Sequence, residues 1–177
     1  MVDVVLASAG ICLAAPLIAF AALAVRLTSR GPAIFVQTRV GRHEMPFRCL
    51  KLRTMWSDTG SVPTHEAPGS AITPVGRVLR RAKIDELPQL WNVLVGEMSM
   101  VGPRPCLPTQ SALIEARRRG DVFSVRPGIT GLAQVRGIDM SIPALCAASD
   151  SEYVAKAGLR CDLHIIAATV LPGITPP

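Results

Sequence analysis

An uninterrupted apolar run near the N-terminus constrains this chain more than any other feature. The 22 residues 4–25 (VVLASAGICLAAPLIAFAALAV) contain no charged side chain; Asp3 precedes them and Arg26 follows. An α-helix of this length reaches about 33 Å, enough to cross a bilayer core of roughly 30 Å. No basic segment precedes the run, and it is longer than the core of a usual signal peptide. We therefore predict a membrane helix rather than a secretory signal.

Pro16 lies near the middle of this run. A proline inside a helix removes one hydrogen bond and clashes with the preceding turn, which costs about 3 kcal/mol. In lipid the carbonyl that is freed needs another partner. Pro16 thus predicts a kink, either in a bent spanning helix or in a helix that enters and leaves by one face. Hydropathy does not separate these two, and by itself it favours the spanning helix.

Composition and charge place the rest of the chain next to a membrane. Only 18% of the 177 residues are charged, against roughly 25% in an ordinary soluble domain. Sixteen of the 19 basic residues are arginines, and residues 26–53 carry the whole net charge of +6. A basic segment after an apolar run is typical of the cytoplasmic side of an anionic membrane. Arginine also suits phosphate, whereas the few aromatic residues argue against nucleic acid as a partner.

The remaining pattern predicts an α+β fold. Two apolar segments, 33–38 and 46–52, predict strands of a hairpin over residues 33–53. Residues 57–74 predict an exposed loop, residues 102–108 predict irregular structure, and residues 126–135 predict a loop followed by a short strand. Helices are expected over 75–81, 85–95, 109–119, 143–157 and 161–171. The last of these is apolar enough to lie on the membrane surface.

Four short segments combine charges in ways that suit phosphate chemistry: KLRTM (51–55), RRAKIDELP (80–88), GPRP (102–105) and RPGITG (126–131). Asp85 and Glu86 could simply cap a helix and favour its dipole, and the arginines could be ion-pair partners. Asp85 could instead be a nucleophile toward phosphorus. An anionic substrate would then need nearby cations or Mg²⁺.

Four longer segments carry a resemblance to a known family: SRGPAIFVQTRVG, FRCLKLRTM, IDELPQLWNVLVGEMSMVGPRP and RPGITGLAQV. In this order and spacing they are similar to the motifs of bacterial sugar transferases of the monotopic phosphoglycosyl transferase family, over about residues 3–169. The resemblance implies transfer of sugar-1-phosphate from a UDP-sugar to undecaprenyl phosphate, with release of UMP. It also implies Mg²⁺ as cofactor and a role in the first membrane step of a bacterial glycoconjugate pathway.

The resemblance assigns roles to individual residues. Asp85 would attack the sugar-bearing phosphorus and form a covalent intermediate in a ping-pong cycle. Glu86 would hold Mg²⁺ together with Asp85, or manage the proton. The phosphate-binding candidates are Lys51, Arg53, Arg80, Arg104, Arg126 and Arg136. Ile138 stands where the family usually has a basic residue, and Arg136 lies two positions away.

The resemblance also favours a re-entrant helix, broken at Ala15 and Pro16, over residues 1–28, followed by an interfacial catalytic domain over residues 29–177. It places the chain on the cytoplasmic face of the bacterial inner membrane, as a monotopic protein among membrane lipids. Ala15 replaces the serine usual in the family and leaves the break with less support. The alternative is a non-catalytic, basic membrane anchor that binds anionic lipid or an acidic partner. The UDP-sugar, the pathway and the oligomeric state stay open.

Overall fold

The structure, a computed structural model, describes residues 2–57, 59, 68–171, 173–175 and 177. Helices and two two-stranded sheets confirm the predicted α+β class. The chain forms two compact units, Met1–Gln37 with Arg48–Val95 and Thr38–Phe47 with Gly96–Pro177. The division expected after residue 28 concerns placement in a membrane and stays a prediction. Half of the loop predicted over 57–74 (residues 58 and 60–67) lies outside the described residues.

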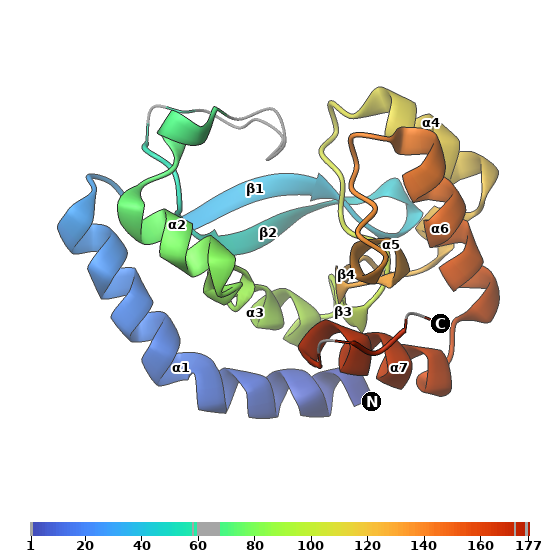
Figure 1. Cartoon of the computed structure of the whole chain (residues 1–177), viewed down its shortest axis with the longest axis horizontal. Helices are drawn as coiled ribbons and strands as arrows, with labels where there is room; N and C mark the ends of the chain where they lie inside the picture. The colour runs from blue at the N-terminus through green and yellow to red at the C-terminus, as the bar shows by residue number, and fades with distance from the viewer. Residues whose placement is uncertain (1, 58, 60–67, 172, 176) are drawn as a thin grey trace. The chain divides into compact units, whose positions relative to one another are not determined.

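Helix α1 (Val2–Thr28) forms the N-terminal part of the first unit and contains Pro16. The helix bends near its middle (Figure 1). Proline is a common cause of such bends, because the carbonyl four residues before it loses its N–H partner. The predicted kink thus takes the form of a bend in one continuous helix, and its re-entrant placement in a membrane stays a prediction.

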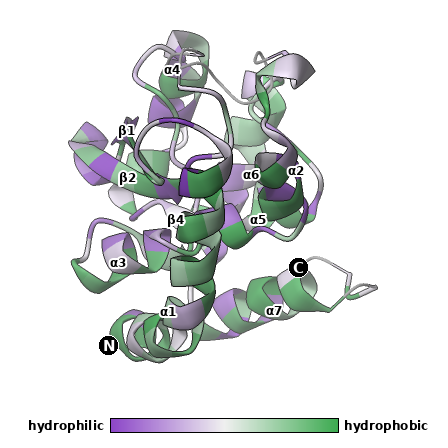
Figure 2. Ribbon diagram, turned by 90° about the vertical axis from the view of Figure 1, so that its left-hand side faces the viewer, coloured by the Kyte–Doolittle hydropathy of each residue, from purple (hydrophilic) through white to green (hydrophobic). Residues whose placement is uncertain are grey.

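The residues of α1 are mostly apolar (Figure 2), and most of them are exposed to solvent. Among the described residues it is the one helix long and apolar enough to cross a membrane. Its buried residues are Ala7, Ala21 and Val25, and the last two join Leu52 and Leu79 in a small core. A helix that leaves most of its apolar surface uncovered is not an ordinary core helix, so the exposed part needs lipid or another apolar partner.

The remaining elements of the first unit bring the chain back to α1. Strands β1 (Ile34–Val40) and β2 (Pro46–Leu52) pair, which confirms the predicted hairpin, and the 3₁₀ turn η1 (Arg42–Glu44) connects them. The end of β1, η1 and the start of β2 (Thr38–Phe47) belong to the second unit. The 3₁₀ turn η2 (Gly69–Ala71) and helix α2 (Pro74–Arg81) follow. Then come the 3₁₀ turn η3 (Ile84–Glu86) and helix α3 (Gln89–Leu94). Both α2 and α3 pack against α1.

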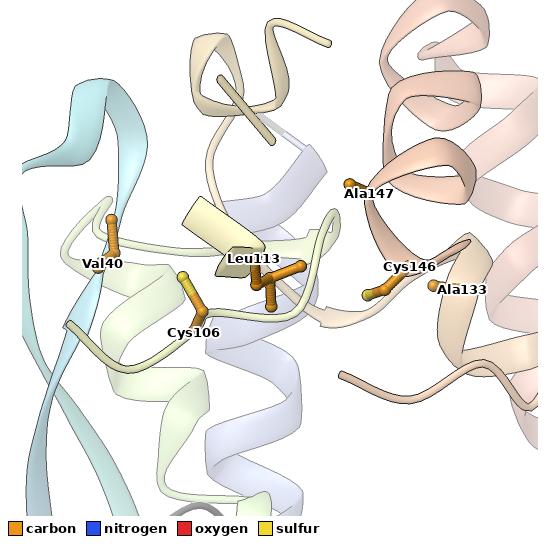
Figure 3. Packing of buried hydrophobic residues seen from close by; sticks show 6 residues of the cluster. All are labelled: Val40, Cys106, Leu113, Ala133, Cys146 and Ala147. Atoms are coloured by element: carbon orange, nitrogen blue, oxygen red, sulfur yellow. The ribbon is translucent and has the colours of Figure 1, made fainter. Parts of the chain in front are cut away.

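The second unit contains two very short parallel strands, β3 (Ser99–Val101) and β4 (Gly128–Thr130), with Ser99 opposite Gly128. Its helices are α4 (Ser111–Arg119), α5 (Leu132–Val135), α6 (Pro143–Lys156) and α7 (Leu159–Val170), and η4 (Val122–Ser124) is a 3₁₀ turn. One apolar cluster packs between these elements (Figure 3): Val40, Cys106, Leu113, Ala133, Cys146 and Ala147.

Two local predictions in this unit need correction. Strand β3 was not expected, and the segment 132–135 is helical, so the short strand of 126–135 lies earlier, at 128–130. Strands of three residues are too short to show a period of two, and β3 is stabilised by pairing with a segment distant in sequence. The irregular segment 102–108 and the two closing helices are confirmed. Helix α7 exposes Leu159, Leu163 and Val170, and its position on a membrane surface stays a prediction.

Candidate active site

The segment that holds Asp85 and Glu86 is not the start of an α-helix, contrary to the prediction for residues 85–95. It is the 3₁₀ turn η3, and α3 begins only at Gln89. Pro88 explains the difference, because it has no N–H to bond to the carbonyl of Ile84. That carbonyl instead accepts a hydrogen bond from the Leu87 amide at 3.2 Å. Asp85 is therefore not a helix cap, and the simplest structural explanation for its presence falls away.

Asp85 is a buried carboxylic acid with a second carboxylic acid beside it. Its residue is only 8% exposed. Burial is the main cause that raises the pKa of Asp85, and the neighbouring charge of Glu86 raises it further. The positive charges of Lys51 and Arg80 act in the opposite direction. An acid whose charge is disfavoured by burial and by a like neighbour is typical of a catalytic site.

Lys51 projects from the end of β2 and meets the second acid. Its Nζ lies 2.7 Å from Oε1 of Glu86, and both side chains are mostly buried. The two residues are far apart in the sequence, so the fold brings them together. The hydrogen bond between the opposite charges orients the Glu86 carboxylate next to Asp85.

Arg80 reaches the same place from the last turn of α2. Its Nε donates to Oγ1 of Thr54 at 2.8 Å, and burial lowers its pKa while Asp85 and Glu86 oppose this effect. The position of α2 is set by Gly76, since a Cβ there would lie 2.1 Å from the carbonyl oxygen of Thr54. The first unit thus places two acids and two bases together, and their formal charges balance.

Arg53, the third predicted phosphate ligand of this unit, has a different set of contacts. Its guanidinium is buried and donates to the carbonyls of Ser29 at 3.0 Å and Gly31 at 3.2 Å, and to that of Arg30. It also donates to Oγ of Ser57 at 2.6 Å. These bonds fix the chain that leaves α1. A phosphate contact of Arg53 stays a prediction.

The other three predicted phosphate ligands belong to the second unit. Arg104 lies in the loop between β3 and α4, and Arg126 is exposed just before β4. Arg136 is also exposed and forms an ion pair with Glu152, so a phosphate would have to displace that carboxylate. Their roles toward phosphate stay predictions.

Two buried arginines hold the loop that carries Arg104, and the sequence analysis did not single out this role. Arg117 is 2% exposed; its Nη1 donates to the carbonyl of Arg104 at 2.9 Å, while its Nε and Nη2 donate to Oδ2 of Asp150 at 2.9 and 2.6 Å. Arg39 donates to the carbonyl of Pro105 at 3.0 Å. Three consecutive arginines at 117–119 look like a solvated basic face, so the sequence contains no signal that one of them is buried.

The paired carboxylates fit the requirements of a magnesium ion. Mg²⁺ prefers oxygen ligands and is usually held by one or two carboxylates together with substrate phosphates and water. Asp85 and Glu86 supply two such groups. The described residues contain no cluster of three or more metal-ligating side chains, so a complete protein cage is absent from this part of the chain. Two carboxylates suit an ion that takes its other ligands from water and substrate, and a bound Mg²⁺ stays a prediction.

Comparison with known proteins places the chain in a class and then in a family. The family model for bacterial sugar transferases matches residues 1–175. The protein is therefore an enzyme of the phosphoglycosyl transferase class. It belongs to the bacterial sugar transferase family, which confirms the resemblance seen in its motifs.

Its relatives include proteins named for transfer to undecaprenyl phosphate. The chain is 44% identical to a UDP-glucose:undecaprenyl-phosphate glucose-1-phosphate transferase of Caulobacter vibrioides, over 96% of this chain and 67% of that protein. It is 40% identical to an undecaprenyl-phosphate glucose phosphotransferase of Komagataeibacter xylinus, over 88% and 32%. An Escherichia coli protein with the same name as the first is 37% identical, over 97% and 39%. The chain thus spans two thirds of the first relative, about a third of the second and about two fifths of the third.

Proposed function

We propose that this protein transfers sugar-1-phosphate from a UDP-sugar to undecaprenyl phosphate, as the first membrane step of a bacterial glycoconjugate pathway. The observation that carries the proposal is the buried Asp85 beside Glu86, with Lys51 and Arg80 at hand. The names of the relatives support the same reaction. Because they specify glucose, UDP-glucose is the first donor to test.

The chemistry proceeds in two displacements at one phosphorus. A carboxylate oxygen of Asp85 attacks the sugar-bearing phosphorus of the donor, a P–O bond forms, and the bond to UMP breaks. The phosphate oxygen of the lipid then attacks the same phosphorus, and the Asp85 carboxylate leaves unchanged. Lys51 and Arg80 stabilise negative charge on the phosphates. Glu86 orients the Lys51 ammonium through their hydrogen bond, so that it faces the donor phosphates.

Asp85 and Glu86 would also hold the Mg²⁺ ion, which would neutralise part of the diphosphate charge. Removal of divalent metal with EDTA should abolish UMP release, and added Mg²⁺ should restore it. Full activity in EDTA would contradict the proposed ion.

A UMP-release assay with the full chain tests the reaction directly. We expect release from UDP-glucose in the presence of undecaprenyl phosphate and Mg²⁺, with other UDP-sugars as comparison donors. Without the acceptor, a ping-pong enzyme should release one UMP per active site and keep a sugar-phosphate on the peptide that contains Asp85, which mass spectrometry detects. A non-catalytic membrane anchor would release no UMP with any donor.

We further propose that α1 enters and leaves the inner membrane by the cytoplasmic face. The bend of α1 and its single proline support this placement. In a variant without native cysteines, a cysteine introduced at Val2 should react with an impermeant thiol reagent only after the cytoplasmic side is opened. Labelling of intact cells from the periplasm would instead show a spanning helix.

A further inference from the structure

A cavity at the C-terminal end of α1 takes no part in the chemistry proposed above. It has a volume of about 530 Å³ and is lined by Arg26, Arg30, Trp56 and Ser57, together with residues 27–29. Both arginines are exposed, and the Trp56 residue is 42% exposed. None of the described residues that line the cavity is acidic. The cavity therefore offers two positive charges and an indole ring to a ligand.

Buried Arg53 adapts this end of the helix to an anion. The chain that follows α1 presents backbone carbonyls at residues 29–31, and their partial negative charge would repel an anionic ligand. Here the carbonyls of Ser29 and Gly31 accept hydrogen bonds from Arg53, and so does that of Arg30. Arg53 also holds Ser57 at 2.6 Å. The guanidinium offsets the partial negative charge of these carbonyls and joins residues 29–31 to Ser57 on the other side of the cavity.

The sequence indicates at which level of the membrane the cavity lies. Arg26 is the first charged residue after the apolar run 4–25. If that run lies in the bilayer, as proposed above, the cavity lies where the hydrocarbon meets the headgroups. Tryptophan favours this level, and arginine there is attracted to anionic lipid. The anionic group of membrane lipids at this depth is phosphate, which a guanidinium can bind with two hydrogen bonds.

We propose that this cavity binds the phosphate group of a membrane lipid, with Arg26 and Arg30 as the charged contacts and Trp56 against the lipid beside them. An anionic phospholipid and the polyprenyl phosphate acceptor carry the same chemistry, and the experiment separates them. The proposal rests on the proposed membrane placement of α1. It does not require Asp85 to be a nucleophile.

Fluorescence of Trp56 tests the proposal. The chain has two tryptophans, so Trp91→Phe leaves Trp56 as the only one. The full-length variant is reconstituted in vesicles of phosphatidylcholine and phosphatidylglycerol, with brominated acyl chains on one lipid or on the other. We expect brominated phosphatidylglycerol to quench Trp56 beyond its share of the lipid, with each arginine giving about a fivefold preference.

Two double variants that lose the same charge separate an effect of the cavity from an effect of total charge. Arg26→Gln with Arg30→Gln should remove the preference. Arg77→Gln with Arg81→Gln, which changes exposed arginines of α2, should keep it. A competition experiment then separates the two lipid sources. Polyprenyl phosphate without bromine is added to the vesicles. Recovery of Trp56 fluorescence identifies the acceptor phosphate as a ligand, whereas persistent quenching identifies the phospholipid. Both results support the lipid-phosphate site.

Other results overturn the proposal. Quenching that follows the mole fraction of whichever lipid is brominated would show that the cavity has no preference for a phosphate lipid. Equal loss of preference in the two double variants would show a general charge effect. Absence of quenching by either lipid would refute the membrane placement as well. UMP release measured on the same vesicles reports separately on the proposed function, since its failure would leave the quenching preference unchanged.

Discussion

Each compact unit buries an aspartate next to an arginine, and the two arrangements differ in how the charge is balanced. In the second unit, Asp150 is 1% exposed and receives two hydrogen bonds from one guanidinium, that of Arg117. In the first unit, Asp85 has another acid as its sequence neighbour, and both burial and that acid raise its pKa. Burial raises the pKa of both aspartates. Asp150 is paired directly with a guanidinium, whereas Asp85 has a like charge beside it that raises its pKa further.

The difference indicates a structural role for one acid and a chemical role for the other. A buried pair with well-formed hydrogen bonds contributes to a unique fold, but it leaves little freedom to react. Asp85 instead shares its surroundings with a second acid and two cations, Lys51 and Arg80, which can also bind a phosphate. Burial by itself would have ranked Asp150 first, so the kind of neighbour, not the degree of burial, separates the two sites.

Substitution of Asp85 should give the largest effect on activity and almost none on stability. Asp85→Asn removes the proposed nucleophile with little change in shape, so UMP release should fall by at least about 10³-fold. Because the repulsion from Glu86 is also removed, the free energy of unfolding should stay the same or rise slightly. The assay with UDP-glucose and chemical denaturation in detergent measure the two effects. Normal turnover of this variant would refute the assigned nucleophile.

Substitution of Asp150 should give the opposite result. Asp150→Ala leaves the Arg117 guanidinium buried without its carboxylate, and we expect a loss of about 3–5 kcal/mol in the free energy of unfolding. The double variant Arg117→Met with Asp150→Leu removes both charges and should recover most of that loss. Denaturation curves of the native protein, of Asp150→Ala and of the double variant measure these differences in the free energy of unfolding. If the double variant were as unstable as Asp150→Ala, packing rather than the unpaired charge would be the cause.

The pH dependence should sharpen the contrast further. In the protein freed of divalent metal, the Asp85 carboxyl should titrate with a midpoint above the usual range of an aspartate pKa, which infrared difference spectroscopy against Asp85→Asn measures. Glu86→Gln should move this midpoint to lower pH, because it removes the like charge, whereas Lys51→Met should move it to higher pH. A profile unchanged by both substitutions would show that another group titrates.

The same shift has a consequence for stability. Between the unfolded and the raised folded pKa of Asp85, the folded protein binds more protons than the unfolded chain. The contribution of Asp85 to stability is therefore present at low pH and is lost as the pH rises through this interval. Asp85→Asn should abolish this part of the pH dependence of the free energy of unfolding. The slope that remains in the variant should come from the other acids alone.

The sequence predicted the parts of this protein that depend on local pattern. The apolar run predicted α1, and two short apolar segments predicted the β1–β2 hairpin. Contacts between distant segments could not be read in this way: neither the pairing of β3 with β4 nor the burial of Arg117 against Asp150 has a local signal. In the site, the motif identified Asp85 and Glu86. The contact between Lys51 and Glu86 required the fold.

Lys83 offers the smallest and most local test of how the first unit holds its acids. It precedes η3 with a φ of 55°, in the left-handed region, which costs an ordinary residue roughly 1–2 kcal/mol and glycine almost nothing. Lys83→Gly should therefore keep or slightly raise the free energy of unfolding. Lys83→Val should lower it by about 1 kcal/mol or more, because a β-branched residue tolerates this conformation poorly.

The activity of these two variants then separates backbone from side chain. The Lys83 side chain is exposed, so Lys83→Gly should leave UMP release nearly unchanged if the residue serves only to turn the chain into η3. Lys83→Val should reduce UMP release together with stability, since Asp85 follows two residues later and moves with the turn. A valine variant that is as stable as the native protein would show that the turn adapts freely. In that case the raised pKa of Asp85 would depend on its charged neighbours more than on a fixed backbone.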